Sequence, residues 1–183
     1  MVHQNAEAAR LLQNYGRYGS REDLDKAISI MKQAVEIIPQ GSKHLAAMLN
    51  NYGAMLGMRF ERTGSMDDLN RAVNVVDMAV DATPYNHPNR AIYLKNLGSR
   101  LGARFEWTRS IDDLNRIVKV ANIAVDTTPY NYPNRVAYLN NLGNWLVTRF
   151  KRTGSIDNLN HTVNVADIAV DTTPYITLVE LCT

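Results

Sequence analysis

The fold is decided by the 45 residues Asn86–Tyr130, which read NHPNRAIYLKNLGSRLGARFEWTRSIDDLNRIVKVANIAVDTTPY. The next 45 residues, Asn131–Tyr175, align with them without a gap and are identical at 29 of 45 positions. Four prolines recur at the same spacing along the chain: Pro39, Pro84, Pro129 and Pro174. A fixed period of this size is typical of architectures in which similar units stack side by side. Such arrays present a long surface that usually binds other chains, so the period favours binding over catalysis.

Each unit is predicted to fold as helix–turn–helix. Apolar residues recur three or four positions apart over Ala91–Phe105, which indicates an amphipathic helix. Asn86 is predicted to cap this helix, with Pro88 near its first position. Ser110, followed by two acids, is predicted to start the second helix, because these groups satisfy free backbone N–H groups and suit the helix dipole. Pro129 then ends that helix, because the residue before a proline is pushed out of helical geometry.

We therefore predict an all-α fold, a right-handed α-solenoid of about four helix–turn–helix units in a single domain over residues 1–183. The units cover approximately residues 1–40, 41–85, 86–130 and 131–175, followed by an irregular C-terminal tail over residues 176–183. No stretch alternates with period two, so β structure is not expected. The last helix lacks the polar capping helix that such arrays need. Two interpretations of the tail stay open: it folds over the last helix, or it marks a truncated sequence.

Composition argues against several classes of partner and compartment. The net charge is only +2 and there is no run of Lys or Arg, so we expect no nucleic-acid partner. Cys182 is the one cysteine, which fits a reducing compartment. Residues 1–7 lack the apolar core of a signal peptide, and no window is apolar enough to span a bilayer. These features predict a cytoplasmic protein with no membrane partner.

No pattern indicates an enzyme, a cofactor or a metal. The paired carboxylates Asp67-Asp68 and Asp112-Asp113 follow a serine, so we interpret them as first-turn acids of helices. No histidine has the spacing of a metal ligand, and there is no glycine-rich phosphate loop. We therefore predict no catalytic residue, no metal site and no cofactor.

Two repeated motifs resemble the tetratricopeptide repeat (TPR). The first helix carries related runs over Leu49–Gly53, Leu94–Gly98 and Leu139–Gly143, and the second places alanine at Ala72 and Ala79 before a closing proline. The Leu-Asn-Asn-Leu-Gly run and the Asn-x-Pro linker are most similar to the kinesin-light-chain subtype, as found in long fungal arrays. The resemblance covers about residues 5–175. The usual repeat has about 34 residues, so these units are longer.

The resemblance implies that the first helices line a concave face and bind an extended peptide. The residues placed on that face are Asn50, Ala54, Met58, Lys95, Ser99, Ala103, Asn140, Asn144 and Thr148. Small side chains would let a peptide approach, and asparagine amides can pair with its backbone. Lys95 could meet a carboxylate. A structural role, such as bridging adjacent helices, stays open for the polar members of this set.

Two further sets repeat along the first helices and are named as secondary candidates. They are Asn51, Asn96 and Asn141, for which a hydrogen bond between units is favoured, and Arg59, Arg104 and Arg149, for which an ion pair with a neighbouring unit is favoured. The function predicted for the chain is a non-catalytic scaffold or adaptor that binds a protein or peptide. The alternative is a structural or self-associating segment of a larger signalling protein, which pairs through its uncapped C-terminal end.

Overall fold

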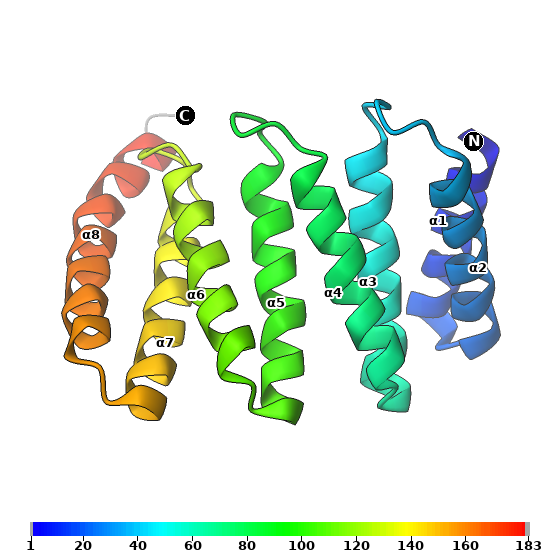
Figure 1. Cartoon of the computed structure of the whole chain (residues 1–183). Coiled ribbons are helices and arrows are strands. Elements are labelled where there is room, and N and C mark those ends of the chain that lie inside the picture. The colour runs from blue at the N-terminus through cyan, green and yellow to red at the C-terminus, as the bar shows by residue number, and fades with distance from the viewer. Residues whose placement is uncertain (1, 182–183) are drawn as a thin grey trace. The chain divides into compact units, whose positions relative to one another are not determined.

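The computed structural model describes the backbone of residues 2–181 and the side chains of residues 7–171. These residues form eight helices and no strand, which confirms the predicted all-α solenoid of helix–turn–helix units (Figure 1). The helices pair into four hairpins in chain order: α1 (Val2–Tyr18) with α2 (Arg21–Ile37), α3 (Leu45–Thr63) with α4 (Met66–Asp81), α5 (Arg90–Thr108) with α6 (Ile111–Asp126), and α7 (Arg135–Thr153) with α8 (Ile156–Leu181).

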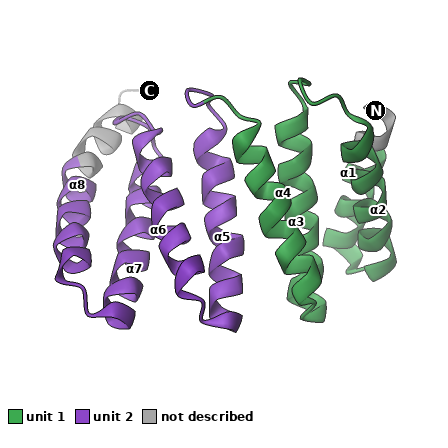
Figure 2. Cartoon of the chain, viewed as in Figure 1, with its two compact units in different colours: residues 1–84 green, residues 85–183 purple. Residues whose placement is uncertain are grey.

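The chain divides into two compact units, residues 1–84 and 85–183, and each unit contains two hairpins (Figure 2). In the first unit α2 packs against both α1 and α3. In the second unit α6 packs in the same way against α5 and α7. Within each unit, the second helix of the first hairpin therefore packs against the first helix of the second hairpin. A single array continuing through both units stays a prediction.

The second helices begin where their serines predict. The side-chain oxygens of Ser20, Ser65 and Ser110 each accept a hydrogen bond from the backbone N–H three residues later, at 3.3 Å. This is the N-cap arrangement that satisfies one free donor at a helix start. Helix α6 ends at Asp126, before Pro129, as predicted.

The predicted start of the first helices is wrong by a few residues. Helix α5 begins at Arg90, and neither Asn86 nor Pro88 belongs to it. Both residues lie in turns instead, and the turn that contains Pro88 is closed by the N–H of Arg90, which donates to the carbonyl of His87 at 3.0 Å. The ring of His87 accepts a second bond from the N–H of Asn89, so local side-chain pairing favours the turn over a helical start.

The predicted irregular tail is also wrong as far as Leu181, because α8 continues past Pro174. After Pro84 and Pro129 a second proline follows four residues later and keeps the chain in a turn. No such proline follows Pro174, so the turn sequence is missing. Residues 182 and 183, which include the one cysteine, lie outside the described part of the chain.

Each first helix from α3 onward ends with one residue in the left-handed conformation. Gly64 and Gly154 adopt this conformation at φ 69°, as expected of a glycine at the C-terminus of a helix. In α5 the same place is taken by Arg109 at φ 57°, the one non-glycine residue with positive φ in the described chain. A side chain in this conformation costs roughly 1 kcal/mol or more, so the hairpin geometry overrides local preference here.

The two cores are built from the predicted apolar positions. In the first unit Leu24, Leu49 and Leu56 are buried in one cluster that joins the two hairpins. In the second unit Leu139 and Leu142 of α7 pack with Val118 of α6. Val118 is a poor helix former, and its burial shows that packing overrides this weak preference.

Candidate functional site

A pocket of about 180 Å³ opens between α5, α6 and α7 of the second unit. Apolar side chains form most of its lining, and polar side chains complete it: Leu94, Lys95, Gly98, Ser99, Ile117, Ala121, Ala124, Tyr138, Asn141 and Trp145. Two of the lining residues, Gly98 and Ala121, have little or no side chain and so leave room for the pocket. In the first unit the position equivalent to Ala121 is Met31, which is 2% exposed and fills its surroundings.

Lys95, Ser99 and Asn141 come together at this pocket, and all three are exposed. Lys95 and Ser99 belong to the predicted peptide-binding set, whereas Asn141 belongs to the secondary set. The Ser99 hydroxyl also donates to the carbonyl of Lys95 at 3.1 Å, which is a local helix contact. The pocket thus combines a cation and an amide with an apolar lining.

Two aromatic residues of the pocket were not predicted from the sequence. Tyr138 is buried and Trp145 is half-buried, and both belong to α7. Trp145 crosses to α5: its ring meets that of Phe105 edge-on with centroids 6.3 Å apart. It also covers Gly102, where an added Cβ would lie 2.8 Å from the indole. The available signal was the change of type along the repeat, since the equivalent residue in α3 is Met55.

The remaining predicted residues are not gathered at this pocket. In the second unit Asn140 and Asn144 are exposed, Ala103 is half-buried, and the half-buried Thr148 donates to the carbonyl of Asn144 at 2.9 Å. Asn96 is half-buried. The Thr148 hydroxyl therefore makes a hydrogen bond within its own helix.

The predicted residues of the first unit lie on α3. Asn50 and Ala54 are half-buried, and Asn51 is exposed. Met58 is half-buried and packs against the core cluster of its unit, so part of its surface serves packing. A common face that carries all the predicted residues stays a prediction.

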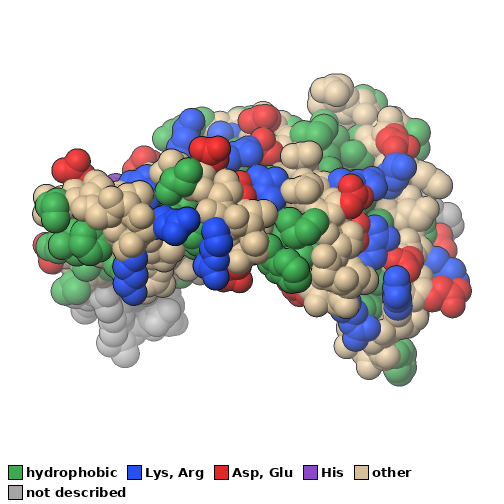
Figure 3. Space-filling model, turned by 60° about the horizontal axis from the view of Figure 1, so that its bottom comes forward, with side chains coloured by type: hydrophobic (Ala, Val, Ile, Leu, Met, Phe, Trp, Pro, Cys, Tyr) green, Lys and Arg blue, Asp and Glu red, His purple; other side chains and the backbone are tan. Residues whose placement is uncertain are grey.

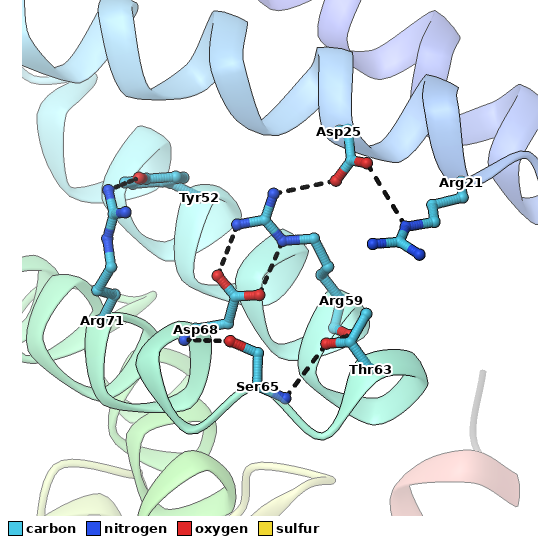
Figure 4. A network of polar contacts seen from close by, with 8 residues as sticks. All are labelled: Arg21, Asp25, Tyr52, Arg59, Thr63, Ser65, Asp68 and Arg71. Carbon is cyan, nitrogen blue, oxygen red and sulfur yellow. Dashed lines mark hydrogen bonds and ion pairs between the residues drawn. The ribbon is translucent and has the colours of Figure 1, made fainter.

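The repeated arginines of the first helices form part-buried polar contacts, and Figure 4 shows those of Arg59. Arg59 binds both oxygens of Asp68, with Nε at 2.8 Å and a terminal nitrogen at 2.6 Å. Its other terminal nitrogen donates to Asp25 of the preceding hairpin at 3.0 Å. The hydrogen bonds to Asp68, with a smaller contribution from Asp25, raise the pKa of Arg59. Arg59 therefore ties three helices of the first unit, and the predicted ion pair with a neighbouring hairpin is confirmed for this residue.

Arg104 and Arg149 occupy the same register in the second unit. Arg104 makes the two-bond contact with Asp113, at 2.9 and 2.6 Å, and this hydrogen bonding raises its pKa. At the fourth hairpin Asn158 replaces the aspartate and accepts one bond from Arg149 at 2.8 Å. Burial lowers the pKa of Arg149. Asp113 lies in the same hairpin as Arg104, and Asn158 in the same hairpin as Arg149, so these bonds join α5 to α6 and α7 to α8.

Charge is divided between the two helices of every hairpin. Each first helix has more Lys and Arg than Asp and Glu, and each second helix has fewer. The extreme cases are α7, with four basic residues and no acid, and α8, with four acids and no Lys or Arg. Figure 3, seen from the side of the hairpin turns, shows many basic side chains at the surface. This division was readable from the sequence once the helices were known.

The described residues contain neither a candidate metal site nor a helix that could span a membrane. In that part of the chain, no three His, Cys, Asp or Glu side chains gather in a way that could hold a metal ion. Over the same residues, no helix has the length and apolar character needed to cross a membrane.

No family model and no curated protein matches the sequence. Solved structures do match. The nearly identical TPR-like repeats of a Podosopora anserina kinesin-light-chain-type protein give a TM-score of 0.60 at 12% identity, covering 95% of this chain and 83% of that one. BtubC (BKLC) from P. vanneervenii gives 0.63 at 16% identity, with 93% and 64% covered. A de novo designed helical repeat protein gives 0.51 at 17% identity, with 97% and 95% covered. At these identities the likeness establishes the fold alone, so the chain is a helical repeat protein.

Proposed function

We propose that this chain is a non-catalytic interaction scaffold of the TPR type, closest in character to the kinesin-light-chain subtype, that works in the cytoplasm. Its first helices bind an extended segment of a partner protein. The observation that carries the proposal is the pocket between α5, α6 and α7, where Lys95, Ser99 and Asn141 adjoin an apolar lining. A pocket of this kind suits one anchoring side chain of a peptide, because affinity concentrates in few buried contacts.

The charge distribution supports an acidic partner segment. Helix α5 carries four Lys or Arg residues and one Glu, and α7 carries four basic residues and no acid. Opposite charge on the partner would speed its association and set its orientation along the helices. We expect the segment to place an apolar side chain in the pocket and a carboxylate at Lys95. The asparagine amides of α7 would pair with its backbone.

The test begins with a library of displayed random peptides selected on the wild-type chain. Enriched peptides are synthesised, and their affinities are measured by fluorescence anisotropy for the wild type, Lys95→Ala and Asn140→Ala. Each substitution is expected to weaken binding by about 1 to 3 kcal/mol, or roughly 5- to 150-fold. Lys119→Ala, which removes an exposed lysine of α6, is the matched control and should leave the affinity unchanged.

A second variant tests the pocket itself. Ala121→Met places in α6 the side chain that Met31 already provides at the equivalent position of α2. We expect it to fill the pocket and abolish peptide binding while circular dichroism still shows the folded helices. Peptides that bind Lys95→Ala and Ala121→Met as tightly as the wild type would refute this assignment of the site.

The alternative role, a structural or self-associating segment of a larger signalling protein, is supported by one observation. Leu159, Val163 and Val170 of α8 are exposed apolar residues. Sedimentation over a range of protein concentrations tests for self-association, and a strict monomer would speak against it.

A further inference from the structure

Helix α8 exposes a face that the other second helices bury. Leu159 is 40% exposed, Val163 54% and Val170 70%. Their equivalents in α6 are Leu114, Val118 and Val125, which are 0%, 3% and 7% exposed. The three α8 residues, together with Ala166, recur at three- and four-residue steps and so lie on one stripe of the helix. We call this stripe the α8 face.

The equivalent stripe of α6 packs against the first helix of the next hairpin. Val118 and Val125 pack with Tyr138, Leu139 and Leu142 of α7. In the first unit, the corresponding residues of α2 lie in one cluster with Leu45, Met48, Leu49 and Tyr52 of α3. In both units the stripe of a second helix therefore receives the apolar side of a first helix. The α8 face has the same residue types in the same register.

Electrostatics narrows the choice of partner. Helix α8 contains four acids, including Asp167 and Asp171, and no Lys or Arg. Asp167 and Asn160 lie on one flank of the α8 face, by their helical positions. Asn160 is the equivalent of Asp25. In the first unit, the Asp25 carboxylate accepts a hydrogen bond from Arg59 of α3. A first helix carries an excess of basic charge, so its charge complements that of α8.

A second copy of the chain fits this face poorly. Two α8 helices would bring like charges together, which costs free energy on desolvation. Helix α1 of a second copy would also fit the α8 face poorly. It has Glu7, Arg10 and Asn14 at the positions where α3 has Tyr52, Met55 and Arg59. Glu7 and Arg10 are exposed. Charged side chains at these places would have to lose water against Leu159 and Val163 without a partner.

We propose that the α8 face is a docking surface for a basic amphipathic helix of the first-helix type, with the apolar pattern of α3 and α7 and an arginine directed toward Asn160. The partner is another helical repeat segment rather than an extended peptide. This surface is separate from the pocket between α5, α6 and α7, so either proposal can fail alone.

The probe is a capped synthetic peptide of residues 131–153, which comprise α7 and the turn before it, added to the full chain. Binding is measured by fluorescence anisotropy against the wild type and against Val163→Asp. We expect binding to the wild type, weaker at higher salt, and a loss of at least about tenfold in Val163→Asp, because a carboxylate would be buried in an apolar contact. Ile168→Asp makes a similar exchange on the opposite side of α8 and should change affinity less than about twofold. The α1 sequence, residues 2–18, is the control peptide and should not bind.

A short peptide is a marginal helix on its own, so a second measurement makes the contact intramolecular. The α7 sequence is attached to the C-terminus of the full chain through a flexible Gly/Ser linker. We expect the midpoint of unfolding to rise, and the rise to vanish in Val163→Asp. Absence of any rise would overturn the proposal. So would peptide binding that ignores Val163→Asp, or a concentration-dependent dimer of the chain alone that Val163→Asp abolishes.

Discussion

The exchange Asn158→Asp is expected to stabilise the second unit. It rebuilds at the fourth hairpin the contact that the third already has between Arg104 and Asp113. At present Arg149 is half-buried and makes one hydrogen bond to the neutral amide of Asn158. A carboxylate there would accept two bonds from the guanidinium and would carry the opposite charge.

The magnitude follows from the bonds gained and lost. One added charge-assisted bond contributes about 1.5 to 3 kcal/mol. The exchange also removes the bond that the Asn158 amide donates to Thr153 Oγ1 at 3.3 Å, a loss of about 0.5 to 1 kcal/mol. Because Arg149 is partly solvated, the net gain should lie near the lower end, about 1 kcal/mol. For a chain of this size that corresponds to a rise of about 2 to 4 °C in Tm.

Thermal unfolding is followed by circular dichroism, and urea unfolding gives the free energy at 25 °C. The reciprocal control is Asp113→Asn, which should lower stability by about 1 to 3 kcal/mol because it leaves Arg104 with a neutral acceptor. In the double exchange the two effects should add, since the two pairs lie in different hairpins, which leaves the stability about 0 to 2 kcal/mol below that of the wild type. If Asn158→Asp is neutral while Asp113→Asn is also neutral, the argument that these pairs stabilise the hairpins is wrong.

Three further predictions concern the ends of helices and two glycines of α5. Arg109→Gly should stabilise the chain by about 1 kcal/mol because it relieves the positive φ, whereas Gly154→Arg should destabilise it similarly, both by thermal unfolding. Gly102→Ala should cost about 1 to 3 kcal/mol, since its Cβ would lie 2.8 Å from an indole ring. Gly98→Ala in the same helix has its nearest contact at 3.6 Å and should be neutral or stabilising in urea titrations. Ser110→Ala should cost about 1 kcal/mol by removing the N-cap of α6, and equal midpoints of denaturation would contradict that role.

Much of the local structure was predictable because its causes are close together in the chain. The serine caps act over three residues, as Ser65 and Ser110 show. The apolar steps from Ala91 to Phe105 reflect the geometry of a single helix. The start of α5 was missed because the ring of His87 and a backbone turn compete with a capping asparagine.

The candidate site was less predictable, because a pocket depends on side chains from three helices. Lys95 and Ser99 could be placed on a face of α5 from the repeat. Their joining with Asn141, Tyr138 and Trp145 depends on how α7 packs on α6. The division of charge between first and second helices needed only the helix boundaries and could have been recognised from the sequence.

The helical character of the described residues, the pairing of helices in a 45-residue repeat and the starts of most second helices could all be deduced from the amino-acid sequence. These features follow from period, propensity and capping, which act within one or two turns. Tertiary structure alone decided that Arg59 joins three helices, that Arg109 takes a left-handed conformation, and that Trp145 lies over Gly102. The tertiary structure also decided that Val118 is buried and Val163 is exposed, although the two occupy the same position in the repeat. The physical reason is that burial depends on the neighbouring helix, and a repeated sequence gives equivalent residues the same local preference but not the same neighbour.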